Sequence, residues 1–162
     1  MKQAIAGVAP PDVSEVTIMT TWPTLAASGA GRALGRLYMI DIGWQWATVG
    51  NLIALLSIPL VLPLYFMTLI PWSVRRYRLT NRRVLIECGI QAKPERWVEL
   101  DRFDEIDVVV LPGQEWYPAG DLVFRKGQIE TFRLFGVSRP ETFRQTCLKA
   151  RMGYVGVKNA QG

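Results

Sequence analysis

The sequence contains no histidine and only two cysteines, and these shortages exclude several kinds of chemistry. Without histidine the chain lacks the commonest general base, the commonest metal ligand and any imidazole that could hold haem. Cys88 and Cys147 lie far apart and form no CxxC pair, so we predict two reduced thiols. The Ser, Thr and Cys side chains have no base to activate them. We therefore predict a non-catalytic protein with no cofactor and no metal site.

An acidic cluster lies between residues 99 and 107 and invites a metal or catalytic interpretation. No histidine and no glycine-rich phosphate loop accompanies it. We therefore interpret the cluster as a solvated loop that leads into a buried strand. Its members are Glu99, Asp101, Asp104, Glu105 and Asp107.

Charge is also missing from residues 42–74, and this is the most informative absence in the chain. The stretch is rich in Leu, Ile, Val, Trp and Phe, and five arginines follow it between residues 75 and 83. A bilayer core about 30 Å thick is crossed by roughly 20 apolar residues in a helix. Arginines directly after such a segment mark its cytoplasmic flank. We therefore predict an interfacial helix over residues 32–42, followed by a transmembrane segment, within residues 32–74.

Two prolines, Pro59 and Pro63, lie near the middle of the apolar stretch and are expected to kink a helix there. One tilted, kinked span is favoured because the stretch is short for two spans. A two-helix hairpin is the alternative.

The flanks of the apolar stretch carry the residues expected to lie at the membrane interface. Tryptophan prefers the headgroup region, and arginines are retained on the inner side. The arginines are also able to bind anionic headgroups, although topological anchoring is the favoured interpretation. No RNA-binding signature or zinc motif accompanies the net charge of +5, so nucleic acid is not an expected partner. The predicted anchor residues are Trp44, Trp46, Trp72, Arg75, Arg76 and Arg78.

Short runs with alternating apolar residues follow the arginines and predict antiparallel strands. Ser138 and Glu141 have the spacing of a capping box and predict a helix over residues 139–152. The tail after Gly153 is expected to be irregular. The predicted strands are 76–80, 83–88, 95–100, 106–111, 121–125 and 130–135.

The segment Tyr77-Arg78-Leu79-Thr80-Asn81-Arg82-Arg83-Val84 resembles the Y-x-L-T-[DN]-x-R-[IV] signature of bacterial pleckstrin-homology-like (PH-like) membrane proteins. The resemblance covers residues 75–152 well and 14–74 loosely. It implies a small β-barrel or sandwich of about six or seven antiparallel strands, closed by the C-terminal helix. Together with the apolar stretch, it predicts a membrane-anchored α+β fold with a transmembrane helix or short hairpin before the PH-like domain.

The predicted organisation is an N-terminal arm (1–31), the membrane segment (32–74), the PH-like domain (75–152) and a C-terminal tail (153–162). Trp97, Trp116 and Tyr117 are candidate protein contacts. An equally weighted alternative for them is that the rings fold back over the end of the barrel.

We predict an accessory subunit of a larger membrane complex, photosynthetic or respiratory, at the bacterial inner membrane with its C-terminal domain in the cytoplasm. The alternative is a membrane-tethered module that binds anionic lipid.

Overall fold

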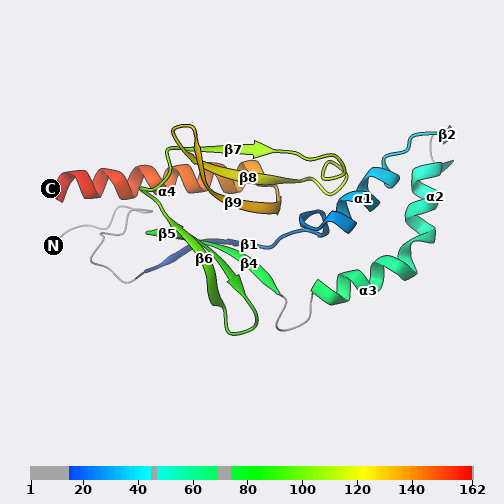
Figure 1. Cartoon of the computed structure of the whole chain (residues 1–162), viewed down its shortest axis with the longest axis horizontal. Coiled ribbons are helices and arrows are strands. Elements are labelled where there is room, and N and C mark those ends of the chain that lie inside the picture. The colour runs from blue at the N-terminus through cyan, green and yellow to red at the C-terminus, as the bar shows by residue number, and fades with distance from the viewer. Residues whose placement is uncertain (1–14, 45–46, 69–73, 162) are drawn as a thin grey trace.

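The computed structural model describes residues 15–44, 47–68 and 74–161, and its main body is a sandwich of two antiparallel sheets (Figure 1). The four-stranded sheet has the order β1-β4-β5-β6 and the three-stranded sheet has the order β7-β8-β9. The strands of the first sheet are β1 (Thr17–Thr21), β4 (Arg75–Thr80), β5 (Arg83–Cys88) and β6 (Lys93–Glu99). The strands of the second are β7 (Glu105–Val109), β8 (Ala119–Lys126) and β9 (Ile129–Ser138).

The core lies between the two sheets and is formed by one side of each strand. Tyr77 and Leu79 of β4 point inward, and so do Val84 and Ile86 of β5, because successive side chains of a strand alternate between its faces. The ring of Phe124 packs edge-on against Phe103, with 4.9 Å between the ring centroids. Burial also raises the pKa of the Tyr77 hydroxyl to about 12, and this hydroxyl donates a hydrogen bond to the Phe135 carbonyl. The alternation in the sequence therefore predicted the buried side of these strands correctly.

The C-terminal helix α4 (Pro140–Gln161) closes the sandwich along β7 and β8. Phe143, Cys147 and Ala150 form its buried face, at the spacing expected of an amphipathic helix. Burial in this face raises the pKa of the Cys147 thiol.

Both ends of α4 differ from the prediction. The residue directly before the helix is Arg139, with φ 48°, whereas Ser138 is the last residue of β9 and is not the helix cap. At the other end the helix continues past Gly153, where an irregular tail was predicted. In these last turns Lys158 forms an ion pair of 2.6 Å with Asp101 of the β6–β7 connection.

A helical extension lies between β1 and β4 in the sequence and at one end of the sandwich in space (Figure 1). Ser28 caps α1, because its Oγ accepts a hydrogen bond of 3.0 Å from the Gly31 amide. The predicted interfacial helix thus starts earlier and ends earlier than expected. The elements of the extension are the 3₁₀ turn η1 (Leu25–Ala27), α1 (Gly29–Tyr38), β2 (Gly43–Trp44), β3 (Ala47–Thr48), α2 (Val49–Leu56) and α3 (Ile58–Thr68).

The prediction of a membrane-anchored fold with a transmembrane helix or hairpin was wrong. Among the described residues, no helix is both long enough and apolar enough to cross a membrane. The apolar stretch is divided at Ser57 into α2 and α3, two short helices set at an angle (Figure 1). Pro59 explains the break, since a proline supplies no amide hydrogen and its ring conflicts with the carbonyl four residues earlier. A new helix then starts from the Ser57 carbonyl, which accepts hydrogen bonds from Leu60 and Val61.

Candidate functional site

The arginines after the apolar stretch are held by carboxylates. Arg76 and Arg78 lie on the outer face of β4 and both contact Glu87 of the neighbouring strand, Arg76 at 2.8 Å. Arg75 forms a pair of 3.3 Å with Glu95. The three predicted anchor arginines are therefore paired with glutamates of the first sheet, and they do not form a cluster of unpaired cations.

Glu87 is the centre of this ionic group. Its side chain is only 1% exposed although it points to the outer face of the sheet, because the two arginine side chains cover it. A carboxylate removed from water in this way is stabilised only while its cationic partners stay in place. The interaction therefore holds β4 and β5 in register.

The signature turn between β4 and β5 fastens the N-terminal strand to the sandwich. Thr80 Oγ accepts hydrogen bonds from the amides of Arg82 and Arg83, as is common for a Thr side chain in a tight turn. Glu15 then accepts two hydrogen bonds from the Arg83 guanidinium, at 2.8 and 2.6 Å. These hydrogen bonds hold the pKa of the Glu15 carboxyl below its usual value.

Aspartates of the predicted acidic cluster pair with different cations and do not converge on one site. Asp101 pairs with Lys158, and Asp104 pairs with Arg151 of the same helix α4. Asp107 pairs with Arg125 on the neighbouring strand at 2.7 Å. These contacts give the aspartates a structural role.

The second group of predicted contacts, Trp97, Trp116 and Tyr117, is divided between two places. Trp97 lies on β6, 52% exposed, with the Arg83 guanidinium 5.7 Å from its ring centroid. Trp116 and Tyr117 lie in residues 110–118, the connection between β7 and β8 that we call the aromatic loop. There the Trp116 ring lies between Tyr38 of α1, at 4.8 Å, and Tyr117, at 4.9 Å. Trp116 nonetheless stays 46% exposed.

Close backbone packing joins the aromatic loop to α1. A Cβ atom at Gly35 would come within 2.1 Å of the Gly113 carbonyl oxygen, and one at Gly113 would come equally close to the Arg32 carbonyl oxygen. Only glycine at both positions permits this approach. The aromatic loop is therefore attached to the helical extension as well as to the sandwich.

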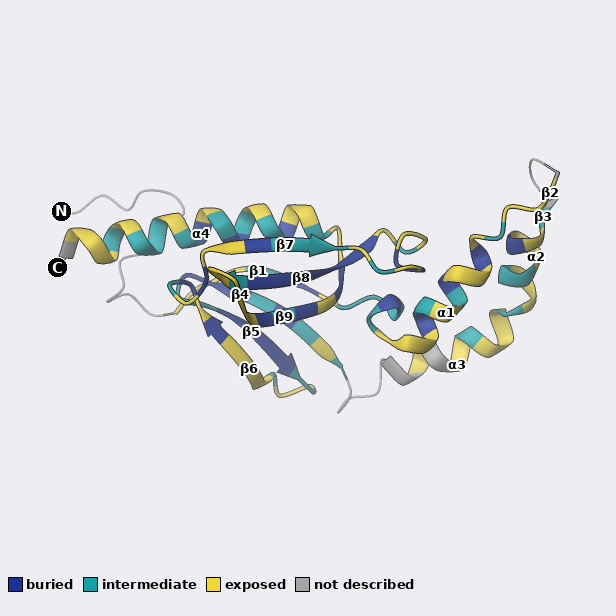
Figure 2. Cartoon of the chain, turned by 45° about the horizontal axis from the view of Figure 1, so that its top comes forward, coloured by how far each residue is buried: buried dark blue, intermediate teal, exposed yellow. Residues whose placement is uncertain are grey.

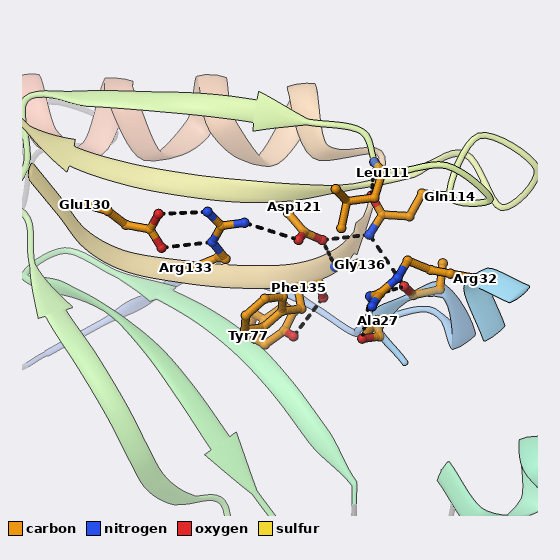
Figure 3. Close-up of polar contacts among 11 residues, drawn as sticks. Ala27, Arg32, Tyr77, Leu111, Gln114, Asp121, Glu130, Arg133, Phe135 and Gly136 are labelled. Atoms are coloured by element: carbon orange, nitrogen blue, oxygen red, sulfur yellow. Dashed lines mark hydrogen bonds and ion pairs between the residues drawn. The ribbon is translucent and has the colours of Figure 1, made fainter. Parts of the chain in front are cut away.

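A buried polar network completes the attachment (Figure 3). Gln114 of the aromatic loop is fully buried and donates a hydrogen bond of 2.7 Å to Asp121 of β8. Asp121 also accepts from the Gly136 amide at 2.9 Å, and Arg133 lies 3.7 Å away. Arg32 reaches the carbonyl of Ala27 from the other side. Gln114 and Asp121 were not predicted from the sequence, because a single Gln in a loop and a single Asp in a strand carry no pattern that marks them as partners.

An uncharged surface covers α2 and α3, which together we call the apolar helix pair. Figure 2 shows exposed residues along both helices, and no charged residue occurs in either. A helix that is apolar on all sides is normally buried, in a protein or in a membrane. The exposed large apolar residues of the pair are Val49, Leu52, Leu55, Leu56, Ile58, Leu60, Leu62, Tyr65 and Phe66.

A groove of about 290 Å³ separates the apolar helix pair from the aromatic loop. Tyr38, Trp116 and Tyr117 form one wall, and side chains of α2 and α3 form the other. The Tyr38 hydroxyl shares a hydrogen bond of 2.5 Å with Ser57. The Tyr117 hydroxyl is buried and has no hydrogen-bond partner among the described residues, and burial raises its pKa. The predicted aromatic contacts at 116 and 117 therefore line a groove.

The predicted tryptophan anchors cannot be placed in this arrangement. Trp46 and Trp72 lie outside the described residues. Trp44 is the last residue of β2, and its side chain is outside the described part of the structure.

Comparison with protein families places one family model on most of the chain. The model of the bacterial PH domain matches residues 23–151, which include the helical extension, both sheets except β1, and the first half of α4. Comparisons with curated proteins and with solved structures gave no match. The family resemblance first seen in the 77–84 signature is thereby confirmed.

Proposed function

This chain belongs to the bacterial PH domain family, and we propose that it is a non-catalytic module that docks on a membrane surface through its apolar helix pair. PH-like domains are generally non-catalytic and often bind lipids or proteins. The apolar helix pair would lie in the acyl region of one leaflet, and the sandwich would lie on the water-filled side. In this arrangement none of the described helices crosses the bilayer.

The observation that carries the proposal is the uncharged, exposed surface of α2 and α3. Burying one Leu or Ile side chain stabilises by about 1.5–3 kcal/mol. Several such side chains together give a larger driving force than a single acyl anchor, which binds membranes only marginally. An electrostatic attachment has less support, because Arg75, Arg76 and Arg78 are paired with glutamates.

We place the module at the cytoplasmic face of the bacterial inner membrane. The buried Cys147 thiol is compatible with this location, since a reducing compartment would keep it reduced. We also propose that the sandwich serves as the accessory part, which contacts subunits of a membrane complex. Trp97 is suited to such a contact, because a half-exposed tryptophan on a rigid strand is a favourable interface anchor.

The test is flotation of the full-length protein with vesicles of zwitterionic phosphatidylcholine. The wild-type protein should float with the vesicles. Leu56→Glu with Leu60→Glu places two charges on the most exposed part of the apolar helix pair and should reduce the floating fraction at least tenfold. The matched control is Ile90→Glu with Ile129→Glu, which changes two equally exposed isoleucines of the sandwich and should float like the wild type.

A wild-type protein that stays at the bottom of the gradient would contradict the proposal. So would equal flotation of the helix-pair variant. If the same surface instead held a second protein, the wild type would remain with that protein after all lipid is removed.

A further inference from the structure

We propose that Asp121 is a positioning residue, which fixes the angle between the helical extension and the sandwich and thereby the orientation of the docked sandwich on the membrane. The second half of this inference rests on the proposed membrane docking, whereas the first half concerns the protein away from a membrane. Asp121 lies on β8, outside the apolar helix pair, so its effect is on orientation and not on membrane affinity.

Asp121 holds the start of the extension through Gly136. Its Oδ1 accepts a hydrogen bond of 2.9 Å from the Gly136 amide. The Gly136 carbonyl in turn accepts hydrogen bonds from the amide and the hydroxyl of Thr24, at 2.8 and 3.0 Å. Gly136 has φ 56°, and a Cβ atom there would come within 2.4 Å of the Ala27 amide nitrogen. The η1 turn therefore packs directly on the residue that Asp121 holds.

The same carboxylate oxygen also holds the aromatic loop. Asp121 Oδ1 accepts a hydrogen bond of 2.7 Å from Gln114, whose own Oε1 accepts one of 2.8 Å from the Leu111 amide. Gln114 and Asp121 are fully buried. The aromatic loop then meets α1 at the close contact of Gly35 with Gly113. Two attachments of the extension, at η1 and at α1, thus converge on one oxygen atom (Figure 3).

We call Asp121, Gln114 and Gly136 the joint. Hydrogen bonds to a carboxylate are about twice as strong as those between neutral groups. Asp121 Oδ2 has no hydrogen bond among the described residues, and Arg133 lies 3.7 Å from it. The carboxylate is therefore stabilised chiefly by the two donors of the joint. An arrangement that separates the extension from the sandwich leaves this buried charge uncompensated, so the network favours one angle.

The joint lies between two surfaces with different proposed tasks. The apolar helix pair belongs to the extension, and Trp97, the proposed contact with a partner subunit, belongs to the sandwich. Figure 1 shows the extension at one end of the sandwich, so a change of angle at the joint moves the far end of the sandwich furthest. A rigid joint therefore presents Trp97 at one height and in one direction.

The first experiment measures the distance distribution between two spin labels in the full-length protein in detergent solution, by double electron–electron resonance. The labels are attached at Leu56→Cys in α2 and Ile129→Cys in β9, both strongly exposed, in a Cys88→Ser background. Asp121→Ala removes the shared acceptor and should at least double the width of the distribution. Asp107→Ala, which removes an ion-paired aspartate of the same sheet, is the matched control and should leave the width unchanged.

Asp121→Ala leaves two buried donors without an acceptor, so a second variant guards against misfolding. Gln114→Leu cuts only the attachment through the aromatic loop and should widen the distribution by about 1.5-fold. Circular dichroism checks that each variant is folded. A folded Asp121→Ala protein with the wild-type width would show that Asp121 does not fix the angle. If Asp121→Ala does not fold, an unchanged width in Gln114→Leu overturns the joint.

The second experiment measures the height of the sandwich above the bilayer. Protein labelled at Ile129→Cys alone is bound to phosphatidylcholine vesicles that contain a trace of nickel-chelating lipid, whose paramagnetic ion speeds the spin relaxation of nearby labels. Asp121→Ala should float within twofold of the wild type, but its relaxation enhancement should change at least twofold. Equal enhancement in the two proteins would overturn the role of Asp121 in orientation on the membrane. If the wild type does not float, the membrane docking is wrong, and the distances in detergent alone decide whether the joint exists.

Discussion

At the scale of one residue, Glu87 shows how burial determines the contribution of an ion pair to the free energy of unfolding. Its carboxylate is covered by Arg76 and Arg78, whereas the carboxylate of Glu95, which pairs with Arg75, is largely exposed. Exposed ion pairs contribute about 0–1 kcal/mol, while removing one partner of a buried pair costs about 3–5 kcal/mol. Because the arginines are themselves about one-third exposed, the cost at Glu87 should lie at or below the lower end of that range.

The first prediction compares the two glutamates. Glu87→Gln should lower the free energy of unfolding by about 2–3 kcal/mol, and Glu95→Gln by less than about 1 kcal/mol. Urea denaturation followed by tryptophan fluorescence measures both. Equal losses of unfolding free energy in the two variants would show that burial of Glu87 does not increase its contribution to stability.

A second residue-scale prediction concerns the glycine contact between α1 and the aromatic loop. Gly35→Ala should destabilise the protein by about 1–3 kcal/mol, because the added methyl group collides with the Gly113 carbonyl. Gly29→Ala in the same helix is the control, since no atom lies within 4 Å of its added Cβ. Thermal unfolding followed by circular dichroism should show a lower midpoint for Gly35→Ala alone.

The residue-scale contacts were only partly predictable from the sequence. The arginine cluster was visible, but its partners Glu87 and Glu15 are fixed by strand register and by the course of the N-terminal segment. Neither feature has a local sequence pattern. The buried Asp121–Gln114 pair likewise could not be predicted, because no local sequence pattern marks the two residues as partners.

At the scale of elements, α4 is longer than its sequence indicates. Glycine normally ends a helix, yet Gly153 and Gly156 both lie inside α4. Packing of the helix on the sandwich and the Lys158–Asp101 contact outweigh the low helix propensity of glycine. Propensity alone therefore predicted the end of the helix too early.

The third prediction concerns Gly156, which is the exposed one of these two glycines. Gly156→Ala should raise the free energy of unfolding by about 0.5–1 kcal/mol, because open space surrounds the added Cβ and alanine favours a helix. Gly127→Ala also meets open space, but its φ of 59° is unfavourable for alanine and should cost about 1 kcal/mol. A lower thermal midpoint for Gly156→Ala would contradict the helical backbone at Gly156, and a higher midpoint for Gly127→Ala would contradict the positive φ at Gly127.

The attachment of β1 through Glu15 gives a fourth prediction. The hydrogen bonds from Arg83 lower the pKa of the Glu15 carboxyl in the folded state below its ordinary value of 4.5. A lowered folded pKa stabilises the protein above the unfolded pKa, and this contribution disappears as the pH falls through the folded pKa. Glu15→Gln should therefore be less stable than wild type at pH 6, and the difference should shrink below about pH 4.5. A difference that stays constant down to pH 3, measured by urea denaturation, would rule out the ionised contact.

At the scale of the whole molecule, the net charge of +5 does not determine where the protein binds. Many of its arginines are paired within the sandwich, and the surface proposed to meet the membrane is uncharged. Long-range attraction to anionic surfaces is strongly screened by salt, whereas apolar burial is not. Salt therefore separates the two modes of binding.

The fifth prediction follows from this charge distribution. Flotation with phosphatidylcholine vesicles should change less than twofold between 0.1 M and 0.5 M NaCl, although the Debye length falls to a few ångströms. Adding anionic lipid should have little further effect in 0.5 M NaCl. Loss of flotation in high salt would favour binding through the arginines.

The overall architecture could be read from the sequence where local patterns were strong. Alternating strands and the 77–84 signature predicted the sandwich and the family. The predicted strand bounds agree within two residues except at the end of β9, which continues to Ser138, and β1 was not among the predicted strands. The apolar stretch was misread because its length was counted as one helix, whereas Pro59 ends α2 and starts a new axis. The close packing of the aromatic loop on α1 depends on contacts far apart in the sequence, and no local pattern encodes it.

The pairing of β1 with β4 determines how the helical extension is connected to the sandwich. Thr21 pairs with Tyr77, so the entire helical extension leaves and returns between two neighbouring antiparallel strands. In topological terms the extension is a very long hairpin loop inserted into an otherwise continuous sheet. The entropy cost of closing a loop rises only slowly with its length. Insertions or deletions within the extension are thus expected to change the contacts that the extension makes, while the strand order of the sandwich stays the same.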